Sequence, residues 1–220
     1  MAQPDPRFDP ILFDLDGTLV DSSRDLAAAV NRTLTRLGIA TLPEPEIVGF
    51  VGDGVHRLME RTLQRAGSGG LEEALSLFKA DYRQSCLVHT RAYPGIPELL
   101  TRLSGTRVGV VTNKPREFAV AVLKGLGLAG LVGAVVGGDE TERIKPAPDP
   151  ILLCLDRLGR TAAAGLMVGD HSNDILAGRA AGLKTCGVLW GFDSGDSVRT
   201  ASPDYLCSGL SELEELLYQR

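Results

Sequence analysis

Short apolar runs alternate with helix-like segments over most of the chain, and this alternation limits the fold more than any other feature. Runs of this length, bounded by turn residues, are typical of buried strands. Strands that alternate with helices favour a parallel sheet covered on both faces. The sequence therefore predicts an α/β protein with a three-layer, Rossmann-like core and a central parallel sheet. Strands are expected at residues 11–13, 107–111, 132–136, 166–168, 184–189 and 204–206, and helices include 97–103, 116–126 and 175–181.

A helical block interrupts this alternation directly after the first predicted strand. Apolar stripes at helical spacing begin after Asp21, where Ser22 or Ser23 is in place to cap the first helix. No segment between Asp21 and His89 is typical of a strand. We therefore expect two domains: an α/β core formed by residues 1–18 and 93–220, and an inserted α-helical cap domain formed by residues 19–92.

The composition argues against several classes of partner. A net charge of -5 and an aromatic content of 5% give no indication of the basic, stacking-rich surface that nucleic acid requires. The uncharged run at residues 125–138 is broken by glycines and is shorter than the roughly 20 apolar residues that cross a bilayer. The first ten residues have no apolar signal segment, so we expect a cytoplasmic protein. Its four cysteines are expected to be buried thiols.

Polar residues follow several of the predicted strands at the point where each strand ends. The carboxyl ends of parallel strands meet at one edge of a sheet, and ligands bind there. Carboxylates that share a pocket repel one another unless a cation lies between them, and oxygen ligands without a histidine or cysteine cluster are typical of Mg²⁺. Such a site would attract a phosphate group on a small molecule. Its expected members are Asp14, Asp16, Thr112, Asn113, Lys145, Asp170 and Asp174.

Four segments carry a family resemblance: FDLDGTLVDS, VVTNK, IKPAPDP and VGDHSND. In order and separation they resemble the four motifs of the haloacid dehalogenase-like superfamily of phosphatases. The helical insert lies between the first and second motifs, as in the phosphoglycolate phosphatase-like branch. IVGFVGDGVHRLM in the insert and HTRAYPGIPELL at its exit are also similar to that branch.

The resemblance implies a role for each motif residue. Asp14 would be the nucleophile that forms an aspartyl phosphate, and Asp16 would protonate the leaving alkoxide and later activate water. The carboxylates of Asp14 and Asp170 and the backbone carbonyl of Asp16 would hold Mg²⁺. Lys145 would balance charge on the phosphate and on Asp14. Asp174 would orient Lys145 or a metal-bound water.

Further residues would contact the substrate. Thr112 and the Asn113 amide would hold phosphoryl oxygens, while Gly17 and Thr18 would bend the loop and add contacts. Gly52, Asp53 and Gly54 precede or begin a predicted cap helix. The backbone N–H groups at this helix start would bind a substrate carboxylate, although an ordinary glycine-rich turn explains the same residues equally well.

Structural interpretations stand beside these roles. Asn113 is also a typical residue at the start of a helix, and Lys145 could be an ordinary loop lysine. The negative charge of Asp174 would also be favourable beside the positive end of a helix dipole. The sequence leaves open whether His171 or Arg24 touches the substrate.

We expect hydrolysis of 2-phosphoglycolate to glycolate and phosphate as the best single assignment. A pyrophosphatase, a nucleotidase or a sugar-phosphate phosphatase is the alternative within the same class. A β-phosphoglucomutase-like mutase is less favoured, because it would need extra basic groups in the hinge and cap. A catalytically idle binding protein is also less favoured, because it would not need the intact set of acids. The sequence does not decide between a monomer and a homodimer, nor does it indicate which cap residues set specificity.

Overall fold

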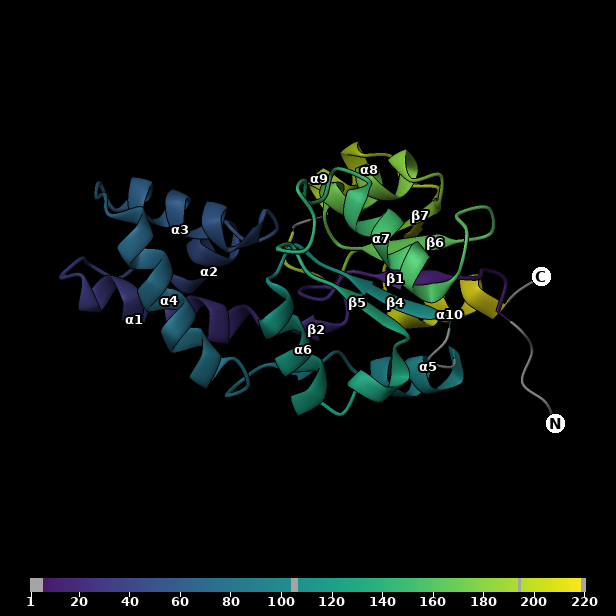
Figure 1. Ribbon diagram of the computed structural model, residues 1–220, viewed down its shortest axis with the longest axis horizontal. Coiled ribbons are helices and arrows are strands. Elements are labelled where there is room, and N and C mark those ends of the chain that lie inside the picture. Colours follow the sequence, from purple (N-terminus) through teal and green to yellow (C-terminus); the bar gives the residue numbers. More distant parts are fainter. Residues whose placement is uncertain (1–5, 104–106, 194, 219–220) are drawn as a thin grey trace.

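The computed structural model describes residues 6–103, 107–193 and 195–218, and it contains a six-stranded sheet (Figure 1). The strand order is β5-β4-β1-β6-β7-β8, and every neighbouring pair is parallel. The first five and last two residues of the expected core domain lie outside the described residues. The strands are β1 (Ile11–Phe13), β4 (Val108–Val111), β5 (Ala134–Val136), β6 (Leu166–Gly169), β7 (Lys184–Val188) and β8 (Tyr205–Cys207).

Strand β1 lies inside the sheet, and its three side chains are apolar and completely buried. It pairs with β4 on one side and with β6 on the other, so that Ile11 lies opposite both Val108 and Leu166. The chain first builds outward from β1 through β4 to β5, and it later builds the other half from β6 to β8. Ligands bind at such a switch point in doubly wound folds, because neighbouring loops diverge there.

Helices cover both faces of the sheet, as the predicted three-layer core requires (Figure 1). Ile11 and Phe13 face a core that continues into the helices of the insert, whereas Leu12 faces the opposite way into a second core. On the sheet, the helices of the first core are α5 (Ile96–Leu103), α6 (Arg116–Gly125) and α10 (Leu210–Tyr218). Those of the second core are α7 (Asp149–Leu158) and α8 (Ser172–Ala180).

The insert forms a group of helices at one end of the molecule, on the left in Figure 1. We call this group the cap; its helices are α1 (Ser23–Arg36), α2 (Glu44–Val48), α3 (Gly54–Arg65) and α4 (Leu71–Ser85). Helix α4 packs against both α1 and α3. Leu26, Val30 and Leu34 form a buried stripe on α1, while Phe78 and Tyr82 project from α4 into the same core. The predicted helical character of the insert is therefore confirmed.

The chain enters and leaves the cap through a short antiparallel ribbon, in which β2 (Val20–Asp21) pairs with β3 (Arg91–Ala92). Beside the ribbon, the buried Asp25 carboxylate accepts hydrogen bonds from the backbone N–H of His89 at 2.9 Å. It also accepts from the backbone N–H and the hydroxyl of Thr90, both at 2.8 Å. These bonds fasten the two crossings together. The domain boundaries at residues 18–19 and 92–93 stay a prediction, which the position of the ribbon supports.

Some local predictions were wrong. Ser22 precedes α1 but does not cap it, because its hydroxyl donates to Asp16 Oδ1 at 2.5 Å. Helix α8 begins three residues before its predicted start, because His171 and Asp174 form a capping box there. Helix α9 (Asp196–Thr200) and the 3₁₀ helix η1 (Ala129–Leu131) were not predicted, since such short segments carry little periodic signal.

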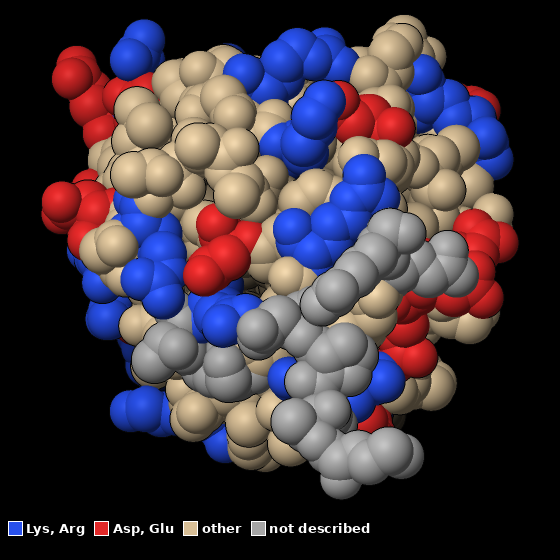
Figure 2. Space-filling view, turned by 90° about the vertical axis from the view of Figure 1, so that its right-hand side faces the viewer, with Lys and Arg blue, Asp and Glu red and all other residues tan. Residues whose placement is uncertain are grey.

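The expectation for the cysteines agrees with the structure. All four cysteines are buried and free. None of the helices in the described ranges combines the length and the apolar character needed to cross a bilayer. On the face opposite the cap, Lys and Arg side chains are mixed with Asp and Glu (Figure 2).

Candidate active site

The end of β1 delivers two carboxylates to the carboxyl edge of the sheet. Asp14 continues the strand, and its backbone N–H donates to the Val168 carbonyl of β6 at 2.9 Å. The chain then turns at Gly17, whose φ of 87° favours glycine. A Cβ at Gly17 would lie only 2.1 Å from Asp170 Oδ2. Glycine is therefore needed both for the turn and for the close approach of these two loops.

Lys145 lies between two of the acids. Its Nζ donates to Asp14 Oδ1 at 2.8 Å, to Asp174 Oδ1 at 2.6 Å and to the Val111 carbonyl at 2.6 Å. These acceptors use all three N–H donors of the ammonium group. Burial alone would lower the pKa of Lys145, but the two carboxylates raise that pKa above its ordinary value, so the side chain stays charged.

Asp170 is a buried carboxylate with no cationic partner among the described residues. Its Oδ1 accepts from the Thr18 hydroxyl at 2.9 Å, and its Oδ2 accepts from the Phe192 backbone N–H at 2.9 Å. Burial, followed by the charges of Asp14 and Asp174, raises the pKa of Asp170 well above its ordinary value. Burial is also the main reason why the pKa of Asp14 is raised to about 6, although Lys145 opposes the shift.

Asp14, Asp170 and Asp174 form a cluster whose carboxylate oxygens lie within 4.8 Å of one another. One ammonium group does not balance three carboxylates, and this repulsion adds to the burial that raises the pKa values of Asp14 and Asp170. A hard divalent cation would remove it, and an all-oxygen donor set is the kind that Mg²⁺ prefers. The residues present therefore fit the expected metal.

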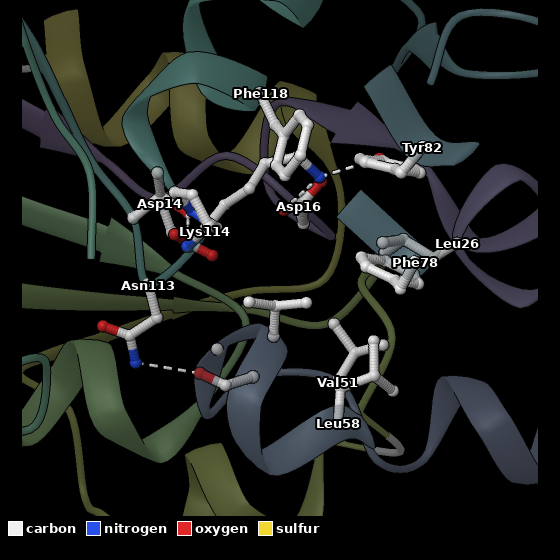
Figure 3. Close-up of a pocket in the computed structure, with 15 residues that line it drawn as sticks. Asp14, Asp16, Leu26, Val51, Leu58, Phe78, Tyr82, Asn113, Lys114 and Phe118 are labelled. Carbon is white, nitrogen blue, oxygen red and sulfur yellow. Dashed lines mark hydrogen bonds and ion pairs between the residues drawn. The ribbon is translucent and has the colours of Figure 1, made fainter. Parts of the chain in front are cut away.

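The Asp16 carboxylate is not part of this cluster and instead faces the cap (Figure 3). Lys114 Nζ donates to Asp16 Oδ1 at 2.9 Å and to Oδ2 at 3.0 Å, and it also donates to the Tyr82 hydroxyl at 2.9 Å. The Ser22 hydroxyl donates to the same Asp16 carboxylate. Tyr82 belongs to α4 of the cap, whereas Lys114 follows β4 of the core. This network therefore links the acid to both parts of the molecule.

Thr112 and Asn113 follow β4, as predicted. The Asn113 Nδ2 donates at 2.9 Å to the carbonyls of Gly52 and Lys145, and its Oδ1 accepts from the Lys145 backbone N–H at 3.0 Å. This side chain therefore fixes the Lys145 loop and touches the cap. The Thr112 hydroxyl is buried and accepts from the Lys114 backbone N–H at 3.2 Å.

The cap loop at the start of α3 lies directly on the core. Asp53 Oδ1 accepts from Asn173 Nδ2 at 2.7 Å, and Asp53 Oδ2 accepts from Arg61 at 2.5 Å. At Gly52 and Gly54, an added Cβ would lie 3.1 Å from the nearest core atom. The two glycines and Asp53 thus bring the cap into contact with the active-site loops.

Two cavities meet at Asp14 and Asp16. One has a volume of about 310 Å³ and contains the acid cluster, Lys145 and His171. The other has a volume of about 60 Å³, lies between the cap and the core and contains Lys114 (Figure 3). Its apolar walls are Leu26, Val51, Val55, Leu58, Phe78, Tyr82, Pro115 and Phe118.

Sequence reasoning missed three residues that complete the site: Lys114, Tyr82 and Asn173. The position of Lys114 two residues after Thr112 was the available signal, whereas Tyr82 was recognised only as part of an apolar helical stripe. Of the two residues left open, His171 accepts at Nδ1 from the Asn173 backbone N–H and lines the larger cavity. Arg24 is exposed and lines neither cavity.

Comparison with known proteins places this site in a family. A family model described as haloacid dehalogenase-like hydrolase matches residues 11–188, which extend from β1 to β7 and include the cap. The chain belongs to the haloacid dehalogenase-like hydrolase family. The family resemblance inferred from the four motifs is thereby confirmed.

Relatives of this haloacid dehalogenase-like hydrolase carry a more specific description. Phosphoglycolate phosphatase from Aquifex aeolicus is 38% identical over 209 residues, which cover 94% of this chain and 95% of that protein. Phosphoglycolate phosphatase from Colwellia psychrerythraea is 37% identical over 214 residues, which cover 92% and 94%. The crystal structure of a predicted phosphoglycolate phosphatase from Haemophilus somnus has a TM-score of 0.88 and is 27% identical, covering 96% of this chain and 98% of that one.

Proposed function

We propose that this protein is a Mg²⁺-dependent phosphomonoesterase that hydrolyses 2-phosphoglycolate through an aspartyl phosphate on Asp14. One observation carries the proposal. A buried carboxylate nucleophile contacts a lysine at 2.8 Å, and a second carboxylate two residues later faces a separate cavity that can hold the leaving group. The curated relatives named above are phosphoglycolate phosphatases over nearly their whole length, which supports the choice of substrate.

In the first step, an Asp14 oxygen attacks phosphorus as the bond between phosphorus and the ester oxygen breaks. Asp16 gives its proton to the departing alkoxide. Lys114 and Ser22 hold the Asp16 carboxylate at the mouth of the smaller cavity, where the ester oxygen would lie. In the second step, Asp16 takes a proton from water, which attacks the phosphorus and releases phosphate and the free Asp14 carboxylate.

The phosphoryl group needs positive charge on its oxygens during both steps. Lys145 supplies one charge, while the Thr112 hydroxyl and the backbone amide of Asn113 would hold phosphoryl oxygens. Mg²⁺ held by Asp14, Asp170 and the Asp16 carbonyl would neutralise charge on the nucleophile and the phosphate. Asp174 keeps Lys145 in place through its 2.6 Å hydrogen bond.

The loop that carries the nucleophile also shapes the phosphate site. Gly17 permits the turn, and Thr18 fixes the Asp170 carboxylate through its hydroxyl. Gly52, Asp53 and Gly54 close the site from the cap side and shield the reacting atoms from bulk water. A sugar-phosphate phosphatase, a nucleotidase or a pyrophosphatase is the alternative that the same chemistry would allow.

The test is release of inorganic phosphate from a panel of phosphate monoesters, with Mg²⁺ and with chelator, scored by kcat/KM. We expect 2-phosphoglycolate among the leading substrates and a loss of turnover in chelator. Asp14→Asn should abolish turnover, whereas Asp156→Asn, an exposed acid on α7, should leave it unchanged. Full activity of Asp14→Asn would exclude the aspartyl phosphate. A poor rate with 2-phosphoglycolate alone would overturn the substrate and keep the reaction class.

A further inference from the structure

The smaller cavity limits the size of the leaving group. Its volume is about 60 Å³, against about 310 Å³ for the larger cavity. Apolar side chains from both the cap and the core form most of its wall. A two- or three-carbon alcohol suits this space better than a hexose or a nucleoside does while the cap is closed.

One cation faces this cavity. Among the described residues that line it, Lys114 alone carries a positive charge. The neighbouring Lys145 lines the larger cavity and not this one.

Lys114 is fixed at the boundary between cap and core. Its ammonium group lies within 3.0 Å of both Asp16 oxygens and at 2.9 Å from the Tyr82 hydroxyl, and its side chain is only 4% exposed. The Nζ also lies 4.7 Å from the centroid of the Tyr82 ring. Burial raises the pKa of Tyr82, so the phenol keeps its proton and can donate a hydrogen bond. In the step that requires a proton on Asp16, the Lys114 ammonium loses that counter-charge, and together with the Tyr82 phenol it then forms a favourable site for a small anion.

The position of Asp16 sets the distance of that anion from the reaction. Asp16 must reach the ester oxygen in order to protonate it. Because Lys114 contacts the same carboxylate, its ammonium group lies close to the atoms that follow the ester oxygen in the leaving group. A charge one or two carbons beyond that oxygen is within reach, and a longer spacer would not fit the cavity.

We propose that Lys114 and Tyr82 bind a carboxylate on the leaving alcohol and thereby select short 2- or 3-carbon phosphoesters that carry an acid group. This inference rests on the proposed phosphatase activity and adds the residues that determine its specificity. Tyr82 comes from the cap, so recognition of the carboxylate requires the cap to be closed, and a substrate without this group loses the contact.

The test compares 2-phosphoglycolate with ethyl phosphate, in which a methyl group replaces the carboxylate. Lys114→Met should lower kcat/KM for 2-phosphoglycolate about 10- to 100-fold more than kcat/KM for ethyl phosphate, which is the worth of a charge-assisted hydrogen bond. Tyr82→Phe, which keeps the ring in the cap core, should give a smaller loss of the same preference. Lys124→Met, at an exposed lysine of α6, is the matched control and should leave both values unchanged.

A second measurement separates recognition from the positioning of Asp16. Glycolate should inhibit ethyl phosphate hydrolysis by the wild-type enzyme, and its inhibition constant should rise about 10- to 100-fold in Lys114→Met. The inhibition constant of inorganic phosphate should stay the same. Equal losses for both substrates, or an unchanged constant for glycolate, would overturn the role given to Lys114. Absence of phosphate release from every ester by the wild-type enzyme would instead refute the proposed function itself.

Discussion

Asp14→Asn should make the metal-free protein more stable at neutral pH, although it removes the nucleophile. Asp14 is buried beside Asp170 and Asp174, and its pKa is raised to about 6. Asparagine has almost the same shape, and its Oδ1 can still accept the hydrogen bond from Lys145. The substitution therefore removes a costly charge without opening a cavity.

The size of the effect follows from the pKa. A group whose pKa is higher in the folded than in the unfolded state adds stability at low pH and loses it as pH rises through the folded pKa. For Asp14 this window runs from its ordinary pKa of 3.8 to about 6. A difference of roughly two pKa units corresponds to about 3 kcal/mol, at about 1.4 kcal/mol per unit. We thus expect Asp14→Asn to exceed the wild type by about 3 kcal/mol at pH 7.5 and to match it near pH 4.

The assay is urea unfolding in chelator at several pH values between about 4 and 7.5, with unfolding free energies compared at each pH. Asp81→Asn provides a control of opposite sign. Burial opposes ionisation of Asp81, but hydrogen bonds from Arg32 lower its pKa overall, so this substitution should destabilise the protein at neutral pH. Added Mg²⁺ should stabilise the wild type more than Asp14→Asn. A variant no more stable than the wild type at pH 7.5 would refute the electrostatic reasoning.

Three further substitutions test local features. Gly17→Ala places a Cβ at 2.1 Å from Asp170 and forces alanine into a positive φ. We expect the free energy of unfolding in urea to fall by about 2 to 4 kcal/mol and phosphatase turnover to be lost, whereas wild-type stability would contradict the clash. Asn173→Ala removes the hydrogen bond between Asn173 and Asp53, which joins the core to the cap. In steady-state kinetics we expect KM to rise about 3- to 10-fold with little change in kcat, whereas a selective loss of kcat would argue against a role in cap closure. Asp25→Ala leaves the donors of His89 and Thr90 unpaired, so the free energy of unfolding should fall by about 3 to 5 kcal/mol in thermal unfolding. A fall of less than about 1 kcal/mol would show that water replaces the carboxylate.

The sequence was sufficient to predict the acid cluster because its geometry depends on a general property of parallel sheets. Asp14 and Asp170 directly follow strands whose carboxyl ends meet, so their convergence required only the strand assignments. Lys145 lies in the loop between β5 and α7, and its motif placed it at the site. The alternation of strands and helices along the chain likewise led to the three-layer core.

The contacts between cap and core could not be predicted in the same way. The hydrogen bond between Lys114 and Tyr82 depends on the angle at which α4 approaches the core, and an amphipathic pattern gives the buried face of a helix without its partner. The capping box at His171 was missed because histidine is an unusual residue at that position. Ser22 was assigned to a helix cap because its alternative partner, Asp16, lies six residues away around a turn.

The ribbon of β2 and β3 makes the cap an exchangeable part. Both crossings lie side by side, so the core is interrupted at a single place, and a different cap could be joined there without lengthening any core strand. The hydrogen bonds from residues 89–90 to Asp25, which hold the two crossings together, lie on the cap side of the ribbon. The exchanged segment would therefore have to carry its own Asp25 together with residues 89–90. It would also carry Tyr82, whereas Lys114 would stay behind. Grafting a foreign cap would thus keep Lys114 beside the catalytic acids and replace only the cap's share in the choice of ester.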